Sequence, residues 1–315
     1  MTAALRAGRF GAVVTAMATP FDDDGRVDID GAVTLARHLA SDGSDGLVVT
    51  GTTGEGPTLA DSERIELWSV VSRAVTVPVV AGSTSNDTAH SVELTRAATE
   101  AGVAGILAVT PYYNRPSQAG IAAHFTAVAG ATRLPVIVYD IPVRTGRKVA
   151  VETMLRLASE CPNVVGVKDA SGDPAGAARL VARAGDGFEC YSGDDSLTLA
   201  LLAIGAVGVV SVASHWVGPE LGEMIRSFFD GDTERARELN AALIDPVSFQ
   251  SSDEAPNPIP TKAVLRGRGL PAGQCRLPMG PAPKGLDDKA RDMLAALQHW
   301  RASRLAESAA AGVHA

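Results

Sequence analysis

Eight short apolar runs, whose starts lie 19 to 34 residues apart, constrain the fold of this chain more than any other feature. Most are rich in valine and isoleucine, and they are bounded by glycine, proline, aspartate or serine. Runs of this kind are typical of parallel strands that are buried on both faces. The eight predicted strands comprise residues 12–18, 46–50, 77–81, 105–110, 134–140, 164–168, 188–191 and 207–212.

The segments between these runs carry alanine, leucine, glutamate and arginine at helical spacing. Asp61 and Asp87 stand where helices are expected to begin, and Gly102 stands where one is expected to end. Eight strands that alternate with helices can close on themselves without leaving an edge, whereas an open sheet would need order reversals that the sequence does not reveal. We therefore expect an α/β fold of the (β/α)₈ TIM barrel type. The predicted helices include one that begins at Asp61 and others over residues 88–100, 118–129, 151–159 and 173–184.

About a hundred residues follow the last predicted strand, which is more than the final helix of a barrel requires. They indicate helices over residues 219–229, 233–243, 258–266 and 286–305, and a frayed tail over 306–315. No linker separates two independent domains. We expect a single unit with a catalytic barrel over residues 1–220 and a C-terminal helical extension over residues 221–315 packed on it.

Charge and composition exclude several classes of function. The chain has 36 acidic and 28 basic residues, and its net charge of −8 argues against binding to nucleic acid. No run of roughly 18 apolar residues is present, so no membrane partner is expected. Three cysteines are too few for a disulfide framework and fit a reducing compartment, so we expect a cytoplasmic protein. The six histidines include no pair at metal-ligand spacing, and residues 51–56 lack the ending of a P-loop.

Reactive groups of a TIM barrel lie where its strands end, and Lys168 is the only one of five lysines at such a position. An ammonium group that is desolvated there has a lowered pKa, and the neutral amine can add to a carbonyl group to form an imine. The alternative is a structural ion pair with Asp169, Asp140 or Glu55. Position alone does not decide between these two interpretations.

Other polar side chains end the neighbouring strands. Tyr139 could move protons to and from an imine, and the hydroxyls of Thr52 and Tyr113 could extend a proton relay. Arg144 offers a planar fork suited to a carboxylate. Each residue also has an ordinary structural interpretation: packing for a tyrosine, turn chemistry for a threonine, and surface exposure for an arginine. Only their convergence on one edge of the barrel favours a catalytic site.

Taken together and in order, six segments at these strand ends resemble one family of enzymes. From about Arg9 to beyond Met279, the chain resembles the class I, pyruvate-dependent aldolases, typified by 4-hydroxy-tetrahydrodipicolinate synthase and N-acetylneuraminate lyase. The segments that carry the resemblance are residues 51–55 (GTTGE), 111–116 (PYYNRP), 139–142 (YDIP), 144–146 (RTG), 166–169 (GVKD) and 192–195 (SGDD).

The resemblance implies a catalytic set and a mechanism. Lys168 forms an imine with pyruvate, and Tyr139 moves protons while the imine becomes an enamine. Thr52 links Tyr139 to Tyr113 in a hydroxyl relay, and in the family the second tyrosine reaches in from the adjoining subunit. No metal or organic cofactor is implied.

The resemblance also implies a substrate-binding set. Thr53 and nearby backbone N–H groups hold the pyruvate carboxylate, and Arg144 meets the carboxylate of the second substrate. Gly193 and Val210 match positions that line the pocket, and Val210 does so through its backbone.

Within the family, three features match the synthase pattern: the Thr52–Thr53 pair, Tyr113 and Arg144. The expected reaction is the condensation of pyruvate with L-aspartate-4-semialdehyde to 4-hydroxy-tetrahydrodipicolinate, in lysine and diaminopimelate biosynthesis. One alternative is a related aldolase or dehydratase that acts on a sugar acid or a 4-hydroxy-2-oxo acid. Another is a non-catalytic homologue that binds a metabolite.

The resemblance implies a homotetramer built as a dimer of dimers, with Tyr112 near the dimer interface. Lysine-inhibited members place histidines and a glutamate around a lysine site, where this chain has Asp61, Arg64 and His90. Only Asn86 and Tyr112 are retained. Without the glutamate, the ammonium group of lysine lacks its counter-charge, so we expect weak or absent feedback inhibition.

Overall fold

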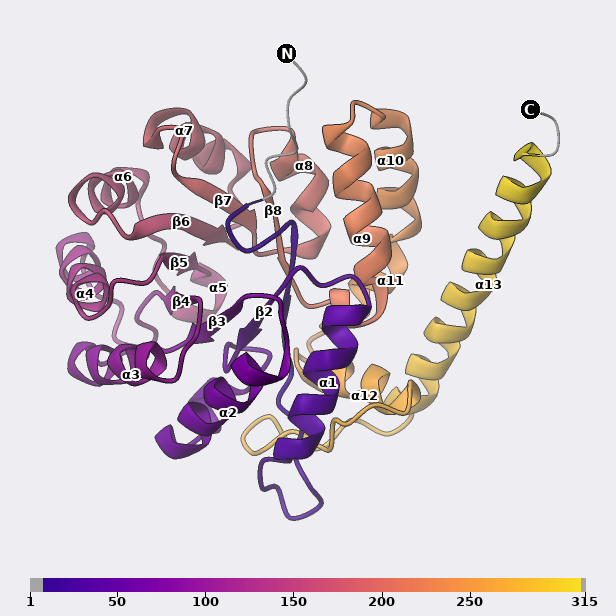
Figure 1. Ribbon diagram of the computed structural model, residues 1–315, viewed down its shortest axis with the longest axis horizontal. Coiled ribbons are helices and arrows are strands. Elements are labelled where there is room, and N and C mark those ends of the chain that lie inside the picture. The colour runs from indigo at the N-terminus through magenta and orange to yellow at the C-terminus, as the bar shows by residue number, and fades with distance from the viewer. Residues whose placement is uncertain (1–7, 313–315) are drawn as a thin grey trace.

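The computed structural model describes residues 8–312 and contains eight parallel strands that close into a barrel (Figure 1). The strands are β1 (Val13–Ala16), β2 (Gly46–Val49), β3 (Val79–Gly82), β4 (Gly105–Val109), β5 (Val136–Asp140), β6 (Val164–Asp169), β7 (Glu189–Ser192) and β8 (Gly208–Ser211). Neighbours in the barrel are neighbours in the chain, and β1 pairs with β8 to close it. The predicted TIM barrel is therefore confirmed, and every predicted strand overlaps an observed one.

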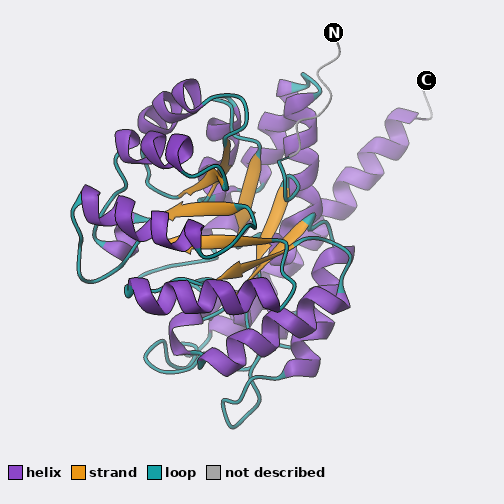
Figure 2. Cartoon of the chain, turned by 60° about the vertical axis from the view of Figure 1, so that its left-hand side comes forward, coloured by secondary structure: helices purple, strands orange, loops and turns teal. Residues whose placement is uncertain are grey.

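Helices surround the barrel, as Figure 2 shows. Short elements also follow β2, β5 and β7, at the edge where the strands end. The elements up to the last barrel helix are α1 (Ile29–Ser41), η1 (Gly56–Thr58), α2 (Asp61–Ala74), α3 (Thr88–Glu100), α4 (Gln118–Gly130), α5 (Pro142–Thr145), α6 (Val151–Glu160), α7 (Pro174–Ala184), η2 (Asp195–Leu197), α8 (Thr198–Leu202) and α9 (Ser214–Phe229).

The acidic residues expected at helix starts act in two ways. Asp87 caps α3, because its carboxylate accepts hydrogen bonds from the N–H groups of Ala89 and His90. Asp61 is instead the first residue of α2, and the N-cap N–H of Ala60 donates to the Glu63 carboxylate at 2.8 Å. Both arrangements place negative charge at the positive end of a helix dipole.

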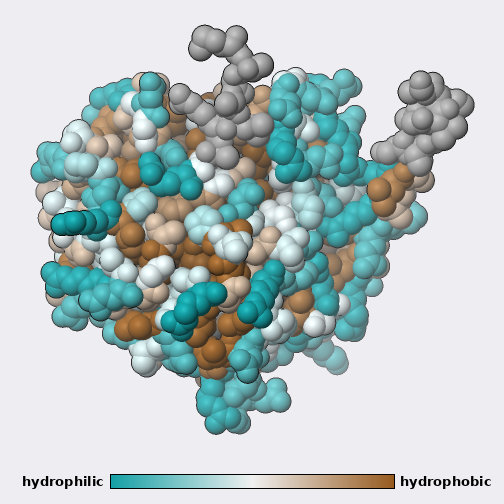
Figure 3. All heavy atoms as spheres, in the orientation of Figure 1, coloured by the Kyte–Doolittle hydropathy of each residue, from teal (hydrophilic) through white to brown (hydrophobic). Residues whose placement is uncertain are grey.

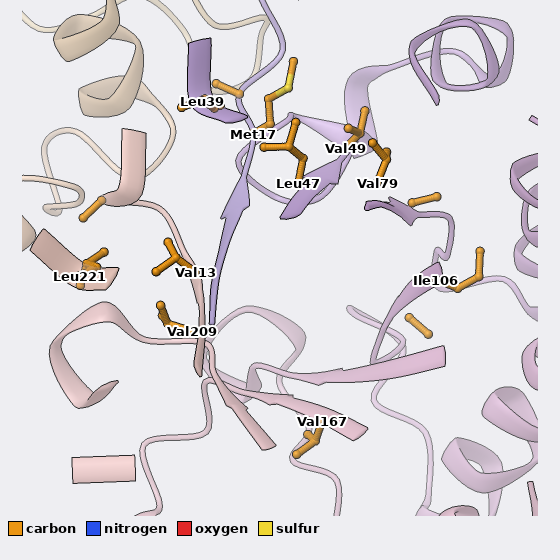
Figure 4. Close-up of a cluster of buried hydrophobic side chains, with 14 of the residues drawn as sticks. Val13, Met17, Leu39, Leu47, Val49, Val79, Ile106, Val167, Val209 and Leu221 are labelled. Atoms are coloured by element: carbon orange, nitrogen blue, oxygen red, sulfur yellow. The ribbon is translucent and has the colours of Figure 1, made fainter. Parts of the chain in front are cut away.

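Alternation along the strands divides the core into two layers. Val13 and Val209 face outward and pack with Leu221 of α9 and other residues between barrel and helices (Figure 4). The next residues, Val14 and Val210, belong to a separate cluster inside the barrel. The same alternation turns each strand-end residue either into the barrel or toward the helices.

The C-terminal extension follows α9 after a loop of three residues, with no long linker between them. It contains α10 (Thr233–Ala242), α11 (Ile244–Ser248), α12 (Ile259–Gly267) and α13 (Leu286–Gly312). The expected division after residue 220 falls inside α9, and residues 1–7 and 313–315 of the two expected units lie outside the described part of the chain. Figure 1 shows α13 at the side of the barrel, with its end directed away from it.

Arginines on α13 tie it to α9. Arg301 Nε lies 2.6 Å from a carboxylate oxygen of Glu220, and Arg304 Nη2 lies 2.8 Å from one of Glu223. The tail expected to be frayed is helical over residues 306–312, because its alanines are strong helix formers that extend an existing helix at little cost. Residues 313–315 lie outside the described chain.

One face of the molecule shows how polar and apolar residues are distributed over the surface. In Figure 3, hydrophilic residues dominate the periphery of the face shown, whereas apolar residues gather toward its centre. Within residues 8–312, no helix is both long enough and apolar enough to cross a membrane.

Candidate active site

Lys168 lies near the end of β6 and points into the barrel. It is only 4% exposed, and its Nζ lies 4.2 Å from the centroid of the Tyr139 ring on β5. Burial lowers its pKa to about 8; the Asp195 charge opposes this lowering and the Arg144 charge adds to it. About a tenth of Lys168 is therefore an uncharged amine at pH 7, far more than of an exposed lysine, and this is the form that can attack a carbonyl carbon.

The three carboxylates considered as ion-pair partners for Lys168 have other contacts. Glu55 lies 2.7 Å from Lys262, and Asp169 accepts a hydrogen bond from the N–H of Ser171 at 2.8 Å. Asp140 accepts one from the N–H of Val149 at 3.1 Å, and burial raises its pKa to about 7. Among residues 8–312, Lys168 has no ion-pair partner, so the structural interpretation is not supported.

Tyr139 is buried beside Lys168, and the two residues are register partners on adjacent strands. Burial raises the pKa of Tyr139 to about 12, and the Arg144 charge and the Thr52 hydroxyl oppose this rise. The phenol therefore keeps its proton at neutral pH. If a carbon atom is bonded to Lys168 Nζ, Tyr139 is close enough to donate its proton to a group that leaves this carbon.

Two adjoining cavities open at this edge of the barrel. The first, of about 190 Å³, is lined by most of the predicted site residues, namely Lys168, Tyr139, Thr52, Thr53, Arg144 and Gly193. The second, of about 350 Å³, shares Thr52, Tyr139 and Arg144 with it and adds Tyr112, Tyr113 and Arg64. Val210, which was expected to line the pocket through its backbone, is not among the residues that line either cavity; it is buried in the interior cluster on β8.

Tyr113 differs from the other predicted site residues because it is 90% exposed. It follows β4 on a loop and has a left-handed backbone conformation, with a φ of 72°. Within the described chain, no hydrogen bond joins its hydroxyl to Thr52. A single copy of the chain therefore does not assemble the proposed relay.

Arg144 lies on α5, directly after β5, and its side chain reaches the cavity. Its Nη2 donates to the backbone carbonyl of Asn257 at 3.5 Å. Within residues 8–312, no carboxylate forms an ion pair with it. A guanidinium group with free donors at a cavity wall is suited to bind the carboxylate of a ligand.

Sequence reasoning missed Asp195 as a functional residue, although it quoted the segment that contains it. Asp195 is buried and accepts hydrogen bonds from the Ser211 hydroxyl and from the N–H groups of Val212 and Ala213. Burial raises the pKa of Asp195, and these donors oppose that rise. Its position after a strand was the one available signal, because its distance from Lys168 depends on barrel closure.

Asn257 was missed as well. It precedes α12 in the C-terminal extension, and its Nδ2 donates to the Thr53 hydroxyl at 3.0 Å, across 204 residues of sequence. Nothing in its local sequence distinguishes it from a loop asparagine. For metal binding, no cluster of three or more histidine, cysteine, aspartate or glutamate side chains occurs in residues 8–312.

Comparison with known proteins connects this geometry to a family. Residues 9–297 match the model of the dihydrodipicolinate synthetase family. The chain is 47% identical over 274 residues to the 4-hydroxy-tetrahydrodipicolinate synthase of Bacillus subtilis, which covers 86% of this chain and 94% of the relative. It is 48% identical over 289 residues to 4-hydroxy-tetrahydrodipicolinate synthase 2 of Streptomyces coelicolor, covering 91% and 95%.

Solved structures of the same family are similar to this chain along most of its length. The dihydrodipicolinate synthase of Bacillus anthracis superposes with a TM-score of 0.87 at 41% identity, covering 91% of this chain and 98% of that one. The lysine-bound enzyme of Cyanidioschyzon merolae superposes with the same TM-score at 44% identity and the same coverage.

Proposed function

The chain belongs to the dihydrodipicolinate synthetase family, and on this premise we propose that it condenses pyruvate with L-aspartate-4-semialdehyde to 4-hydroxy-tetrahydrodipicolinate. The reaction is a step of lysine and diaminopimelate biosynthesis. The observation that carries the proposal is the pairing of Lys168, a buried lysine without an ion-pair partner, with the buried phenol of Tyr139. The cavity that holds both residues also presents Thr53 and Arg144.

The first step forms an imine. The neutral amine of Lys168 attacks the C2 carbonyl carbon of pyruvate, and the resulting carbinolamine loses water. Tyr139 supplies the proton that the departing hydroxyl needs, because its raised pKa keeps the phenol protonated. Loss of a C3 proton then converts the imine into an enamine.

The second step forms the carbon–carbon bond. The enamine carbon attacks the aldehyde carbon of the semialdehyde, whose oxygen takes up a proton and becomes a hydroxyl group. The amino group of the same substrate then attacks the imine carbon and displaces Lys168 as the ring closes. The water lost during imine formation is the only small molecule released, and Lys168 is regenerated.

Two groups are assigned to substrate carboxylates. Thr53 and adjoining backbone N–H groups hold the pyruvate carboxylate within the first cavity. Arg144, exposed at the cavity mouth, binds the carboxylate of the semialdehyde. A sugar-acid aldolase would not depend on Arg144, so full activity of Arg144→Ala with the semialdehyde would favour that alternative.

A homotetramer built as a dimer of dimers is the assembly we propose. An exposed tyrosine held in a left-handed conformation beside a cavity is suited to contact a second subunit. In such a dimer, Tyr113 of one copy completes the relay through Thr52 of the other. We also propose a cytoplasmic location, which the unpaired state of Cys161, Cys190 and Cys275 supports.

Weak or absent inhibition by lysine is proposed as well. His90 Nε2 lies 2.9 Å from Asp61, and Arg64 lines the second cavity close to Tyr112. Of Asp61, Arg64 and His90, only Arg64 carries a fixed positive charge, and none is the glutamate that receives the ammonium group in lysine-inhibited members of the family. We expect millimolar lysine to leave the rate nearly unchanged in a coupled assay, and a halved rate would contradict this expectation.

One experiment tests the function directly. The protein is incubated with pyruvate, reduced with borohydride and analysed by mass spectrometry, and is then assayed with the semialdehyde for the cyclic product. We expect an adduct on Lys168 together with product. An adduct without product would favour a sugar-acid aldolase, and the absence of an adduct would contradict the imine mechanism.

A further inference from the structure

Asn257 of the C-terminal extension contacts the catalytic cavity through a residue assigned to substrate binding. Its side-chain Nδ2 donates to Thr53 Oγ1 at 3.0 Å, and both residues are buried and line the first cavity. Thr53 lies on the loop after β2, whereas Asn257 lies two residues before the start of α12. The contact therefore joins the extension to the barrel at the site of chemistry.

In the structure, the Asn257 amide turns its oxygen away from Thr53 and toward a second hydroxyl. The Thr261 hydroxyl, one helical turn further on, donates to Asn257 Oδ1 at 3.1 Å. With the oxygen occupied in this way, the NH₂ group faces Thr53. The backbone of Asn257 is also held, because its N–H donates to the Ser251 hydroxyl at 3.2 Å and its carbonyl accepts from Arg144 at 3.5 Å.

This orientation determines the role of the Thr53 hydroxyl. A hydroxyl group has one proton to donate, and here its oxygen accepts the proton of Asn257. Among residues 8–312, no acceptor is present for the Thr53 hydroxyl proton, which remains available to a ligand in the cavity. A carboxylate is the ligand group that gains most from such a donor, because hydrogen bonds to charged groups are stronger than neutral ones.

We infer that Asn257 is a positioning residue that presents the Thr53 hydroxyl as a hydrogen-bond donor to the carboxylate of the 2-oxo acid substrate. This inference rests on the proposed function. It assigns the C-terminal extension a part in selecting 2-oxo acids over neutral ketones. The Asn257 carbonyl also accepts a hydrogen bond from Arg144. Asn257 therefore contacts both Thr53, assigned to the pyruvate carboxylate, and Arg144, assigned to the carboxylate of the semialdehyde.

The test compares imine formation with a charged and a neutral probe. Half-saturating concentrations of pyruvate and of methyl pyruvate are measured by borohydride trapping and mass spectrometry. For Asn257→Ala, we expect the half-saturating concentration of pyruvate to rise about tenfold. The half-saturating concentration of methyl pyruvate should change less than about threefold. The maximal rate of trapping stays within about threefold of that of the original chain.

The isosteric change Asn257→Asp gives the sharper result. A carboxylate at this position accepts the Thr53 proton and adds a negative charge beside the substrate carboxylate. We therefore expect the half-saturating concentration of pyruvate to rise more than with Asn257→Ala, although the shape of the side chain is preserved. Thr261→Val, which frees the amide to turn, is expected to cause a rise of about threefold and keeps the test informative if both Asn257 variants fold poorly.

Asn163 provides a matched control. Like Asn257 it donates through Nδ2, but to the backbone carbonyls of Ala129, Thr132 and Leu134 at 3.0, 3.1 and 3.3 Å. It lies before the first residue of β6, at the opposite end of that strand from Lys168. Asn163→Asp is expected to leave the pyruvate value unchanged.

The outcomes separate the two proposals. An unchanged pyruvate value in Asn257→Asp, or equal rises for pyruvate and methyl pyruvate, would overturn the inference while the proposed function stands. No imine with pyruvate in the original chain would overturn the proposed function and the inference with it.

Discussion

The chain buries two lysines, and their surroundings are opposite in kind. Lys168 sits inside the barrel, where residues 8–312 provide it with no ion-pair partner and Tyr139 is its nearest aromatic neighbour. Lys262 of α12 is equally buried, but its Nζ lies 2.7 Å from Glu55 and donates to the backbone carbonyl of Gln274 at 3.0 Å. The ring of Phe21 lies 4.0 Å away.

Burial lowers the pKa of both lysines, yet only one has its charge compensated directly. For Lys262, Glu55 opposes the effect of burial through charge and hydrogen bonding at contact distance. For Lys168, the opposing charge is Asp195, which is not in ion-pair contact with it. The difference indicates that burial favours the neutral amine of a lysine most where no carboxylate compensates its charge directly, and this supports the proposal that Lys168 is the nucleophile. Lys262, which is paired, instead joins Glu55 on the loop after β2 to the C-terminal extension.

The largest expected effect comes from the volume-conserving change Lys168→Met. It removes the amine that forms the imine, so we expect no borohydride-trapped adduct and a rate lower by at least roughly a thousandfold. The free energy of unfolding is expected to stay the same or rise, because an uncompensated buried charge is removed. Urea denaturation measures this second effect, and a trapped adduct on Lys262 in the variant would break the comparison.

The matched change Lys262→Met should have the reverse effect. It leaves Glu55 buried without a counter-charge, so we expect the free energy of unfolding to fall by about 3–5 kcal/mol. The adduct on Lys168 should still form. Combining the change with Glu55→Gln should recover part of the loss in urea denaturation, and no recovery would show that the ion pair is not the cause.

Tyr139→Phe tests whether the neighbour of Lys168 acts by chemistry or by packing. The variant keeps the ring and loses the phenol proton, so we expect the imine to form more slowly and the rate to fall by roughly a hundredfold. Thermal unfolding should change little, because the volume of the ring is kept. The corresponding neighbour of Lys262 is Phe21, which has no proton to donate. A Tyr139→Phe rate within threefold of the original would assign Tyr139 to packing.

The pH dependence is the smallest expected effect. Below about pH 8, the trapping rate should rise about tenfold per pH unit as Lys168 loses its proton, and then level off. Between about pH 8 and pH 10, the unfolded chain keeps a proton that folded Lys168 has lost, so stability should rise with pH. Lys168→Met should reduce this rise, whereas Lys262→Met should leave the contribution of Lys168 in place. Urea denaturation across this range measures both contributions.

Much of the architecture was predictable because it depends on local pattern. The periodic strands, the eightfold alternation and the position of Lys168 at a strand end follow from apolar runs and their boundaries. The tail was misjudged because its alanines continue α13 to Gly312. Tyr113 was expected by resemblance to reach the relay from an adjoining subunit, and within one chain it lies exposed.

The partners of the buried polar groups were not predictable in the same way. Glu55 was one of three candidate partners for Lys168, and it pairs with Lys262 from the extension instead. The contact between Asn257 and Thr53 spans 204 residues and leaves no trace in local sequence.

The sequence by itself determined the barrel, the edge that carries the reactive groups and the identity of the candidate nucleophile, because strand periodicity and strand ends are local properties. Tertiary structure alone decided which lysine keeps an ion-pair partner, which hydroxyl has a free proton and where the extension meets the cavity. The physical reason is that ionisation and hydrogen-bond direction depend on burial and on the nearest partner. Both depend on how segments distant in the chain pack together.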